Sequence, residues 1–179
     1  MPTQPTSSRH SAIAAAIGTE PLASSDGRQS QTALGIARGV GRCVASHGFC
    51  VIPEVTLANG RRADLMALSE GGEIWIIEIK SSVEDFRADQ KWPEYRDFCD
   101  RFFFAIETSF PRDLIPDSVG LILADRFGGE VVRPAPAHKL VAPRRKAILT
   151  LFARTAGQRL HTALDPDMRR YVRGWPEMP

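Results

Sequence analysis

The feature that most constrains this chain is an apolar run, residues 74–80, that ends with a glutamate and a lysine two residues apart. Its sequence, Ile-Trp-Ile-Ile-Glu-Ile-Lys, is typical of a strand buried in a sheet. Because side chains alternate faces along a strand, Glu78 and Lys80 should share the face of Ile74 and Ile76. Charged residues there indicate either an ion pair at the solvated strand end or a chemical site.

Two acidic residues upstream give the Glu-x-Lys pattern more weight. Asp64 lies fourteen residues before Glu78, in a second strand-like run, and Glu54 lies in a third run further upstream. Two carboxylates on neighbouring strands can hold a divalent metal ion, and a lysine beside them can assist at a phosphate. A single Glu-x-Lys is common by chance, but the three acidic residues together favour a site over an ion pair.

The segments around these residues predict a meander of three strands. Residues 31–47 repeat apolar side chains at three- and four-residue steps, which predicts an amphipathic helix ending at Gly48. Strands are predicted at residues 49–57, 61–69 and 73–80. The turn sequences Ala-Asn-Gly and Glu-Gly-Gly separate them, so consecutive strands should pair antiparallel.

The remainder of the chain predicts a crossover helix, further strands and a last helix. Ser82 is a candidate N-cap for a helix at residues 84–91, and Pro93 should open a second short helix that reaches residue 99. The remaining predicted elements are short apolar strands at 102–106 and 119–124, an edge strand at 131–132 and a long helix at 143–162. The predicted fold is α/β: a mixed sheet of a three-stranded meander, a crossover helix and two further strands, flanked by helices.

Length and composition predict one domain with a tail at each end. Residues 1–30 are rich in Ser, Thr, Ala, Gln and Pro and are expected to be disordered, residues 31–162 to form the domain, and residues 163–179 to form a C-terminal tail. No segment is long and apolar enough to span a membrane, and three cysteines without zinc or disulfide spacing suit a cytoplasmic protein. No glycine-rich phosphate loop follows a strand, so no nucleotide cofactor is expected.

Charge is distributed unevenly along the chain. The overall net charge is +2, but residues 31–132 carry −5 and residues 133–179 carry +7. The acidic centre suits metal binding, and the basic segment suits a phosphate backbone. Arg144, Arg145 and Lys146 at the start of the last helix are therefore candidate contacts to a phosphate backbone, as is Arg62, although basic runs are usually solvated surface.

The element order and the positions of Glu54, Asp64 and Glu78-x-Lys80 resemble those of the PD-(D/E)XK nuclease superfamily. A closer resemblance, to the MmcB-like family of bacterial DNA-repair proteins that are expected to be endonucleases, covers residues 31–162. It is carried by the sequences Arg-Arg-Ala-Asp-Leu (61–65), Glu-Ile-Lys-Ser-Ser (78–82), Lys-Trp-Pro-Glu-Tyr (91–95) and Cys-Asp-Arg-Phe-Phe (99–103). Ala63 departs from the superfamily pattern by standing where a proline would precede the aspartate. The resemblance implies a restriction-endonuclease-like fold and a Mg²⁺-dependent deoxyribonuclease acting in DNA repair.

The resemblance also implies roles for single residues. Asp64 and Glu78 would bind Mg²⁺ or Mn²⁺, and Lys80 would lie near the attacking water and the scissile phosphate. Glu54 would be a further metal ligand, directly or through water, or else a solvated strand residue. Related nucleases carry a polar residue and a tyrosine four positions apart on the helix after Glu-x-Lys, so Lys91 and Tyr95, with Gln90 as an alternative, are expected to support the site.

Two other functions remain open from the sequence. A catalytically silent DNA-binding module of the same fold would keep the basic surface without bringing Asp64 and Glu78 together, and in a third reading the carboxylates are merely solvated. The presence of Asp64, Glu78 and Lys80 together favours a nuclease. Neither the DNA structure that it recognises nor the use of a homodimer to cut both strands follows from the sequence.

Overall fold

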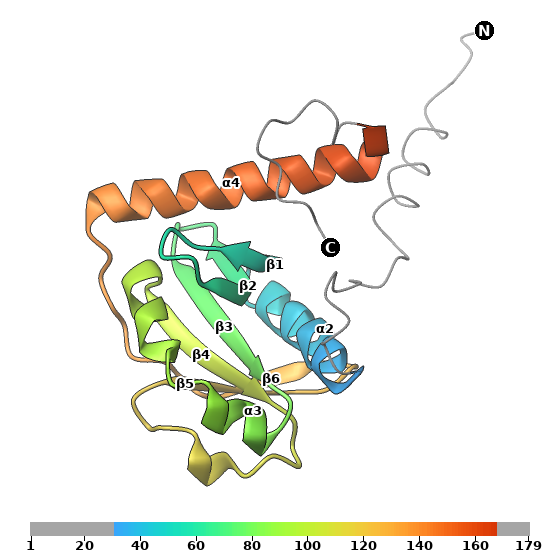
Figure 1. The fold of residues 1–179 in the computed structure, drawn as a ribbon, viewed down its shortest axis with the longest axis vertical. Helices are drawn as coiled ribbons and strands as arrows, with labels where there is room; N and C mark the ends of the chain where they lie inside the picture. Colours follow the sequence, from blue (N-terminus) through green and yellow to red (C-terminus); the bar gives the residue numbers. More distant parts are fainter. Residues whose placement is uncertain (1–30, 168–179) are drawn as a thin grey trace, which may run out of the picture. The chain divides into compact units, whose positions relative to one another are not determined.

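The computed structural model describes residues 31–167 (Figure 1). The tail predicted at residues 1–30 and the part of the C-terminal tail from residue 168 onward lie outside the described residues. Of the described residues, 31–153 belong to one compact unit, which contains the whole sheet. Within residues 31–167, no helix is long and apolar enough to cross a membrane.

The sheet has six strands in the order β1-β2-β3-β4-β5-β6. The first three form the predicted antiparallel meander: β1 (Phe49–Thr56), β2 (Arg62–Ser69) and β3 (Ile74–Lys80). After a crossover, β4 (Arg101–Ile106) and β5 (Gly120–Ala124) continue parallel to β3, and β6 (Gly129–Arg133) pairs antiparallel with β5. The predicted mixed α/β sheet is therefore confirmed, including its edge strand.

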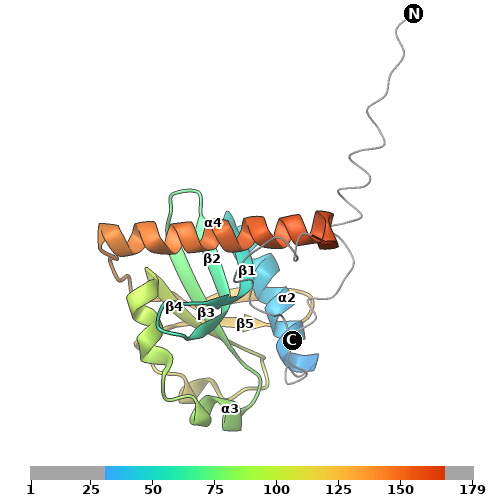
Figure 2. The same cartoon turned by 45° about the horizontal axis from the view of Figure 1, so that its top comes forward.

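Helices flank this sheet (Figures 1 and 2). They are α2 (Gln31–Ser46), α3 (Val83–Ala88), η1 (Trp92–Phe98), η2 (Arg112–Leu114) and α4 (Ala142–Leu164). As predicted, two short helices follow β3, but the second, η1, is a 3-10 helix with Pro93 in its first turn. Lys91 precedes η1 as its N-cap, so Lys91 and Tyr95 do not lie on a continuous α-helix.

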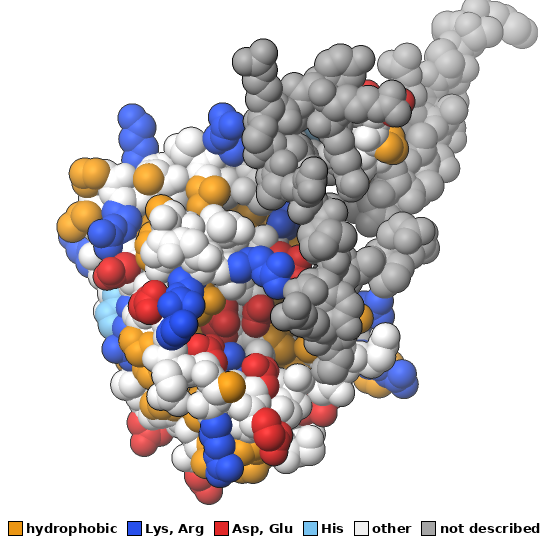
Figure 3. Space-filling view, viewed as in Figure 1, with side chains coloured by type: hydrophobic (Ala, Val, Ile, Leu, Met, Phe, Trp, Pro, Cys, Tyr) orange, Lys and Arg blue, Asp and Glu red, His pale blue; other side chains and the backbone are white. Residues whose placement is uncertain are grey.

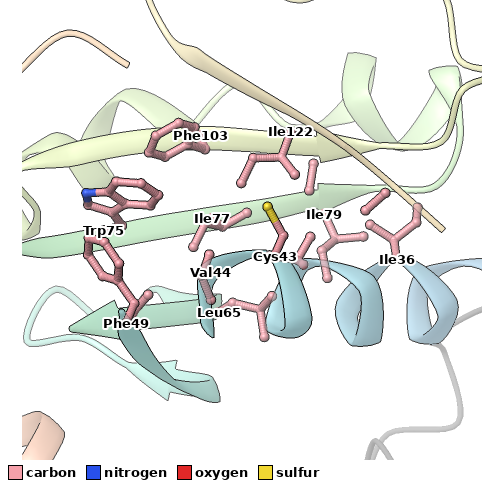
Figure 4. Packing of buried hydrophobic residues seen from close by; sticks show 14 of the residues in the cluster. Ile36, Cys43, Val44, Phe49, Leu65, Trp75, Ile77, Ile79, Phe103 and Ile122 are labelled. Carbon is pink, nitrogen blue, oxygen red and sulfur yellow. The ribbon is translucent and has the colours of Figure 1, made fainter. Parts of the chain in front are cut away.

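The two faces of the sheet are packed differently. Trp75, Ile77 and Ile79 of β3 point into an apolar core beneath α2, where the Trp75 ring lies between those of Phe49 and Phe103 with centroids 4.2 and 4.6 Å away (Figure 4). The opposite face of β3 presents residues 74, 76, 78 and 80 toward the crossover segment. The alternation predicted for this strand is thus observed, and it separates a purely apolar face from one that carries charge.

An ion pair ties α4 to the beginning of β3 and β4. The buried Asp100 carboxylate accepts the N–H of Ile74 at 2.9 Å and two hydrogen bonds from Arg145, at 2.8 and 2.5 Å. Arg145 also donates to the Gly72 carbonyl at 2.8 Å. Burial by itself raises the pKa of Asp100, but the hydrogen bonds that its carboxylate accepts from Arg145 and Ile74 outweigh burial and hold that pKa below its usual range. Arg145 therefore anchors the first turns of α4.

Two glycines of α2 should respond oppositely to alanine. A Cβ at Gly39 would collide with the backbone carbonyls of Asp125 and Gly128, whereas one at Gly41 would meet only Val51, at 3.8 Å. We expect Gly39→Ala to lower the free energy of unfolding by about 1–3 kcal/mol through overpacking. Gly41→Ala should raise it by about 0.5–1 kcal/mol, because alanine favours a helix. Urea denaturation of both variants checks this, and equal effects would contradict the close packing at Gly39.

Candidate active site

Asp64 and Glu78 meet where β2 and β3 separate. The antiparallel ladder pairs Leu65 with Ile77, so the next position places Asp64 opposite Glu78. At this position carboxylate oxygens replace backbone carbonyls as hydrogen-bond acceptors. Glu78 Oε1 accepts the N–H of Asp64 at 3.1 Å, and Asp64 Oδ2 accepts the N–H of Ile79 at 2.8 Å. Backbone donors at the end of the ladder are thereby satisfied. Each carboxylate is oriented by the strand that carries the other.

Glu54 lies at the same level of the sheet. Its neighbours pair as Pro53 with Leu65 and Val55 with Ala63, which places Glu54 opposite Asp64. Its φ of 47° is in the left-handed region, a strained conformation that non-glycine residues adopt mainly at special sites. However, within residues 31–167 no three acidic, histidine or cysteine side chains gather closely enough to chelate a metal ion by themselves. Asp64 therefore lies between Glu54 on β1 and Glu78 on β3, at one level of the sheet.

Burial dominates the electrostatics of this pair. The Glu78 side chain is nearly enclosed, with a residue exposure of 5%. Burial raises the pKa of Asp64 to about 6. Burial first, and then the charge of Asp64, raise the pKa of Glu78 well above its usual range. Two adjacent carboxylates in this environment favour a bound cation or a proton.

Lys80 is held by Asp89, which is not among the residues predicted from the sequence. Its Nζ donates to Asp89 Oδ2 at 2.7 Å and lies 4.0 Å from Asp85. Burial by itself lowers the pKa of Lys80, but the hydrogen bond from Lys80 to Asp89 and the nearby acidic charges outweigh it and raise that pKa. Asp89 Oδ1 also accepts the N–H of Lys91 at 3.1 Å, so one carboxylate joins Lys80 to the start of η1.

A signal for Asp89 was present in the sequence. Asp85 and Asp89 are four residues apart in the segment predicted as the helix after Lys80. Residues at this spacing share one face of a helix. Two acidic residues on one face directly after a buried lysine could therefore have been predicted to pair with that lysine.

The three predicted supporting residues have different environments. Tyr95 is buried, and its hydroxyl donates to the Arg62 carbonyl at 3.0 Å. Burial, followed by the charges of Glu78 and Asp64, raises the pKa of Tyr95, so the hydroxyl stays protonated. By contrast, Gln90 donates to the Arg87 carbonyl at 2.9 Å, and Lys91 is exposed. Of these three candidates, Tyr95 is the one that the structure places against the carboxylate pair.

The four residues predicted to contact DNA also have different environments. Arg62 and Lys146 are exposed, and Arg144 donates to the Asp97 carbonyl at 3.2 Å. Arg145 is engaged by Asp100, so its position is explained by the fold itself. Figure 3 shows acidic side chains gathered at the centre of the face viewed in Figure 1, with Lys and Arg side chains around them.

Comparisons with known proteins point to one family. Residues 20–167 match the family described as DNA repair protein MmcB-like. Among solved structures, a protein of unknown function from Silicibacter pomeroyi matches with a TM-score of 0.75 and 45% sequence identity, over 78% of this chain and 95% of that one. No curated protein matches.

Replacing Asp64 with asparagine should stabilise the metal-free protein at neutral pH. The native pKa of about 6 exceeds the ordinary 3.8, so the native state binds more protons between these values, and stability falls as pH rises through about 6. We expect Asp64→Asn to recover up to about 3 kcal/mol above pH 6 and nothing below pH 4. Thermal unfolding in a chelator, followed by circular dichroism, measures this.

The control for this prediction is Glu70→Gln, which changes an exposed carboxylate. Its effect should be small and independent of pH. Added Mg²⁺ should raise the melting temperature of the wild type and of Glu70→Gln above pH 6, but not that of Asp64→Asn, because ligand binding stabilises only the state that binds it. A less stable Asp64→Asn protein at pH 8 without metal would contradict the buried, charged pair.

Proposed function

Because the chain belongs to the MmcB-like family of DNA repair proteins, we propose that it is a metal-dependent deoxyribonuclease, a hydrolase of DNA phosphodiester bonds. One observation carries this proposal. Asp64 and Glu78 meet at the end of the β2–β3 ladder, each oriented by a backbone N–H, and Lys80 follows two residues later on the same strand face. Two oriented carboxylates and an ammonium form a donor set suited to a cation and a phosphate together.

The donor set fits Mg²⁺ or Mn²⁺. Carboxylate oxygens are the ligands that these hard ions prefer, and Mg²⁺ usually keeps several waters and is held by one or two carboxylates plus phosphate oxygens. A carboxylate has about four acceptor positions, so Asp64 and Glu78 keep capacity for an ion beyond their backbone hydrogen bonds. When bound, the ion would supply an acidified water and neutralise charge on the phosphate.

The surroundings of Lys80 favour an electrostatic role over proton abstraction. Its ammonium donates to Asp89 at 2.7 Å in a nearly enclosed position, which stabilises the charged form. A charged lysine can donate to phosphate oxygens and stabilise the negative charge that builds on them during hydrolysis. Tyr95 supports this arrangement indirectly, since its bond to the Arg62 carbonyl holds β2 two residues from Asp64.

The test is cleavage of labelled single-stranded, duplex, nicked and branched DNA in Mg²⁺ or Mn²⁺. We expect Asp64→Asn and Lys80→Ala to lower cleavage by at least about a hundredfold, as loss of one preorganised group typically does. Glu70→Gln should keep wild-type activity. If all four proteins bind DNA but the wild type cuts none of the substrates, the proposal fails, and a silent DNA-binding module becomes the better account.

Asp89 should matter for turnover more than Asp85 does. Asp89 bonds Lys80 at 2.7 Å, whereas Asp85 lies 4.0 Å from it with an exposed side chain. If Asp89 positions Lys80, Asp89→Asn should lower kcat about tenfold with little change in KM, since one charge-assisted hydrogen bond is weakened. Asp85→Asn should change kcat less than about twofold. Equal effects of the two substitutions would contradict a specific positioning role.

A further inference from the structure

A large apolar groove borders the β1–β2 hairpin, which leads into the strand that carries Asp64. It has a volume of about 790 Å³ and lies between the β1–β2 hairpin, the end of η1 and the first half of α4. Its lining is mostly aliphatic, with one aromatic ring, Phe98, one amide, Asn59, and one guanidinium, Arg144. Val141 at its edge is 65% exposed. An aromatic ring, an amide and a cation around an apolar space match the parts of a nucleotide.

Two elements are shared by the groove and the carboxylate pair. The hairpin that supplies Asn59 returns as β2, which carries Arg62 and Asp64. The helix that supplies Phe98 also carries Tyr95, whose hydroxyl bonds the Arg62 carbonyl. At about 3.4 Å per extended residue, Asn59 lies no more than roughly 17 Å along the chain from Asp64. A DNA strand at the carboxylates can therefore reach the groove within a few nucleotides.

Arg144 is suited to receive a phosphate at the groove. Its guanidinium lies 5.8 Å from the centroid of the Phe98 ring and 3.5 Å from the Asp97 carboxylate. The Asp97 side chain is 73% exposed, and such exposed ion pairs contribute little stability, so a phosphate can replace this partner. Lys146, two residues later, is exposed and adds positive charge to the same helix end. This charge complements a DNA backbone.

We propose that this groove binds an unpaired nucleobase, with the adjoining phosphate on Arg144. The inference rests on DNA being the substrate, as proposed above, and narrows that substrate to DNA with unpaired nucleotides. A base inside an intact duplex is stacked and paired, and extracting it costs free energy, whereas a base in a single strand, gap or branch is already accessible. Stacking on an aromatic side chain is largely independent of base identity, so the groove recognises DNA structure more than sequence.

Binding measured in a chelator tests the groove without any cutting. The probes are a fluorescein-labelled single strand, the same strand with abasic sites, and the matching duplex. We expect the wild type to bind the base-bearing strand about tenfold or more tighter than the abasic strand, since each stacked base adds that much. Ala147→Phe, which fills the groove, should remove this preference and leave binding of the abasic strand unchanged.

The matched control is Ala153→Phe. Ala153 is also an exposed alanine of α4, but it is not part of the groove lining. This variant should retain the wild-type preference for the base-bearing strand. Arg144→Ala should weaken binding of the base-bearing and abasic strands alike and reduce the salt dependence of both. If Ala147→Phe fails to fold by circular dichroism, Val141→Asp replaces it, because Val141 is exposed and an added carboxylate there repels phosphate.

Three results would overturn the inference. The first is equal binding of the base-bearing and abasic strands by the wild type, and the second is an unchanged preference in the variant that fills the groove. The third is a change of oligomeric state in Ala147→Phe, seen by size-exclusion chromatography with DNA binding unaltered, which would make the groove an interface between copies. If the wild type prefers the base-bearing strand but cuts no DNA, the nuclease proposal fails and the inference about the groove stands.

Discussion

The exchange of hydrogen bonds between Asp64 and Glu78 is the constraint on which the rest of the site depends. As β2 and β3 separate, the N–H groups of Asp64 and Ile79 would be left without ladder partners. Unpaired buried donors are costly, and the two carboxylates satisfy them. The same bonds place two negative charges side by side in a mostly enclosed position. The end of the ladder thus creates an electrostatic cost that a bound cation would remove.

The crossover segment between β3 and β4 balances part of this negative charge through Lys80. Asp89 is fixed by both oxygens, one bonded to Lys80 and one to the N–H of Lys91. Tyr95 adds a second connection from η1 to β2. Because β3 and β4 run parallel, the chain must cross from one end of the sheet to the other, and that crossing covers the charged face. The topology therefore supplies the residues that hold Lys80.

One face of β3 packs into the apolar core, and the other carries the candidate site residues. The residues that point toward α2 are purely apolar and close-packed around Trp75. The opposite face ends in Glu78 and Lys80, which remain buried at 5% and 4% exposure. The basic residues at the start of α4 also differ in role. Arg145 anchors the helix on Asp100, whereas Lys146 is exposed. One short sequence motif can therefore contain both a structural and a surface cation.

The sequence alone determined the antiparallel meander of β1–β3 and the alternation of β3, because these follow from local period and turn chemistry. With a family resemblance, the sequence also selected Asp64, Glu78 and Lys80 as site candidates, whose roles stay a prediction. It did not determine which side chains pair across the fold. The bond from Lys80 to Asp89 required the path of the crossover, and the bonds from Arg145 to Asp100 required the placement of α4. Turn signals and periodicity act between neighbours in the chain, whereas these partners are set by packing between distant segments, so only the tertiary structure decided them.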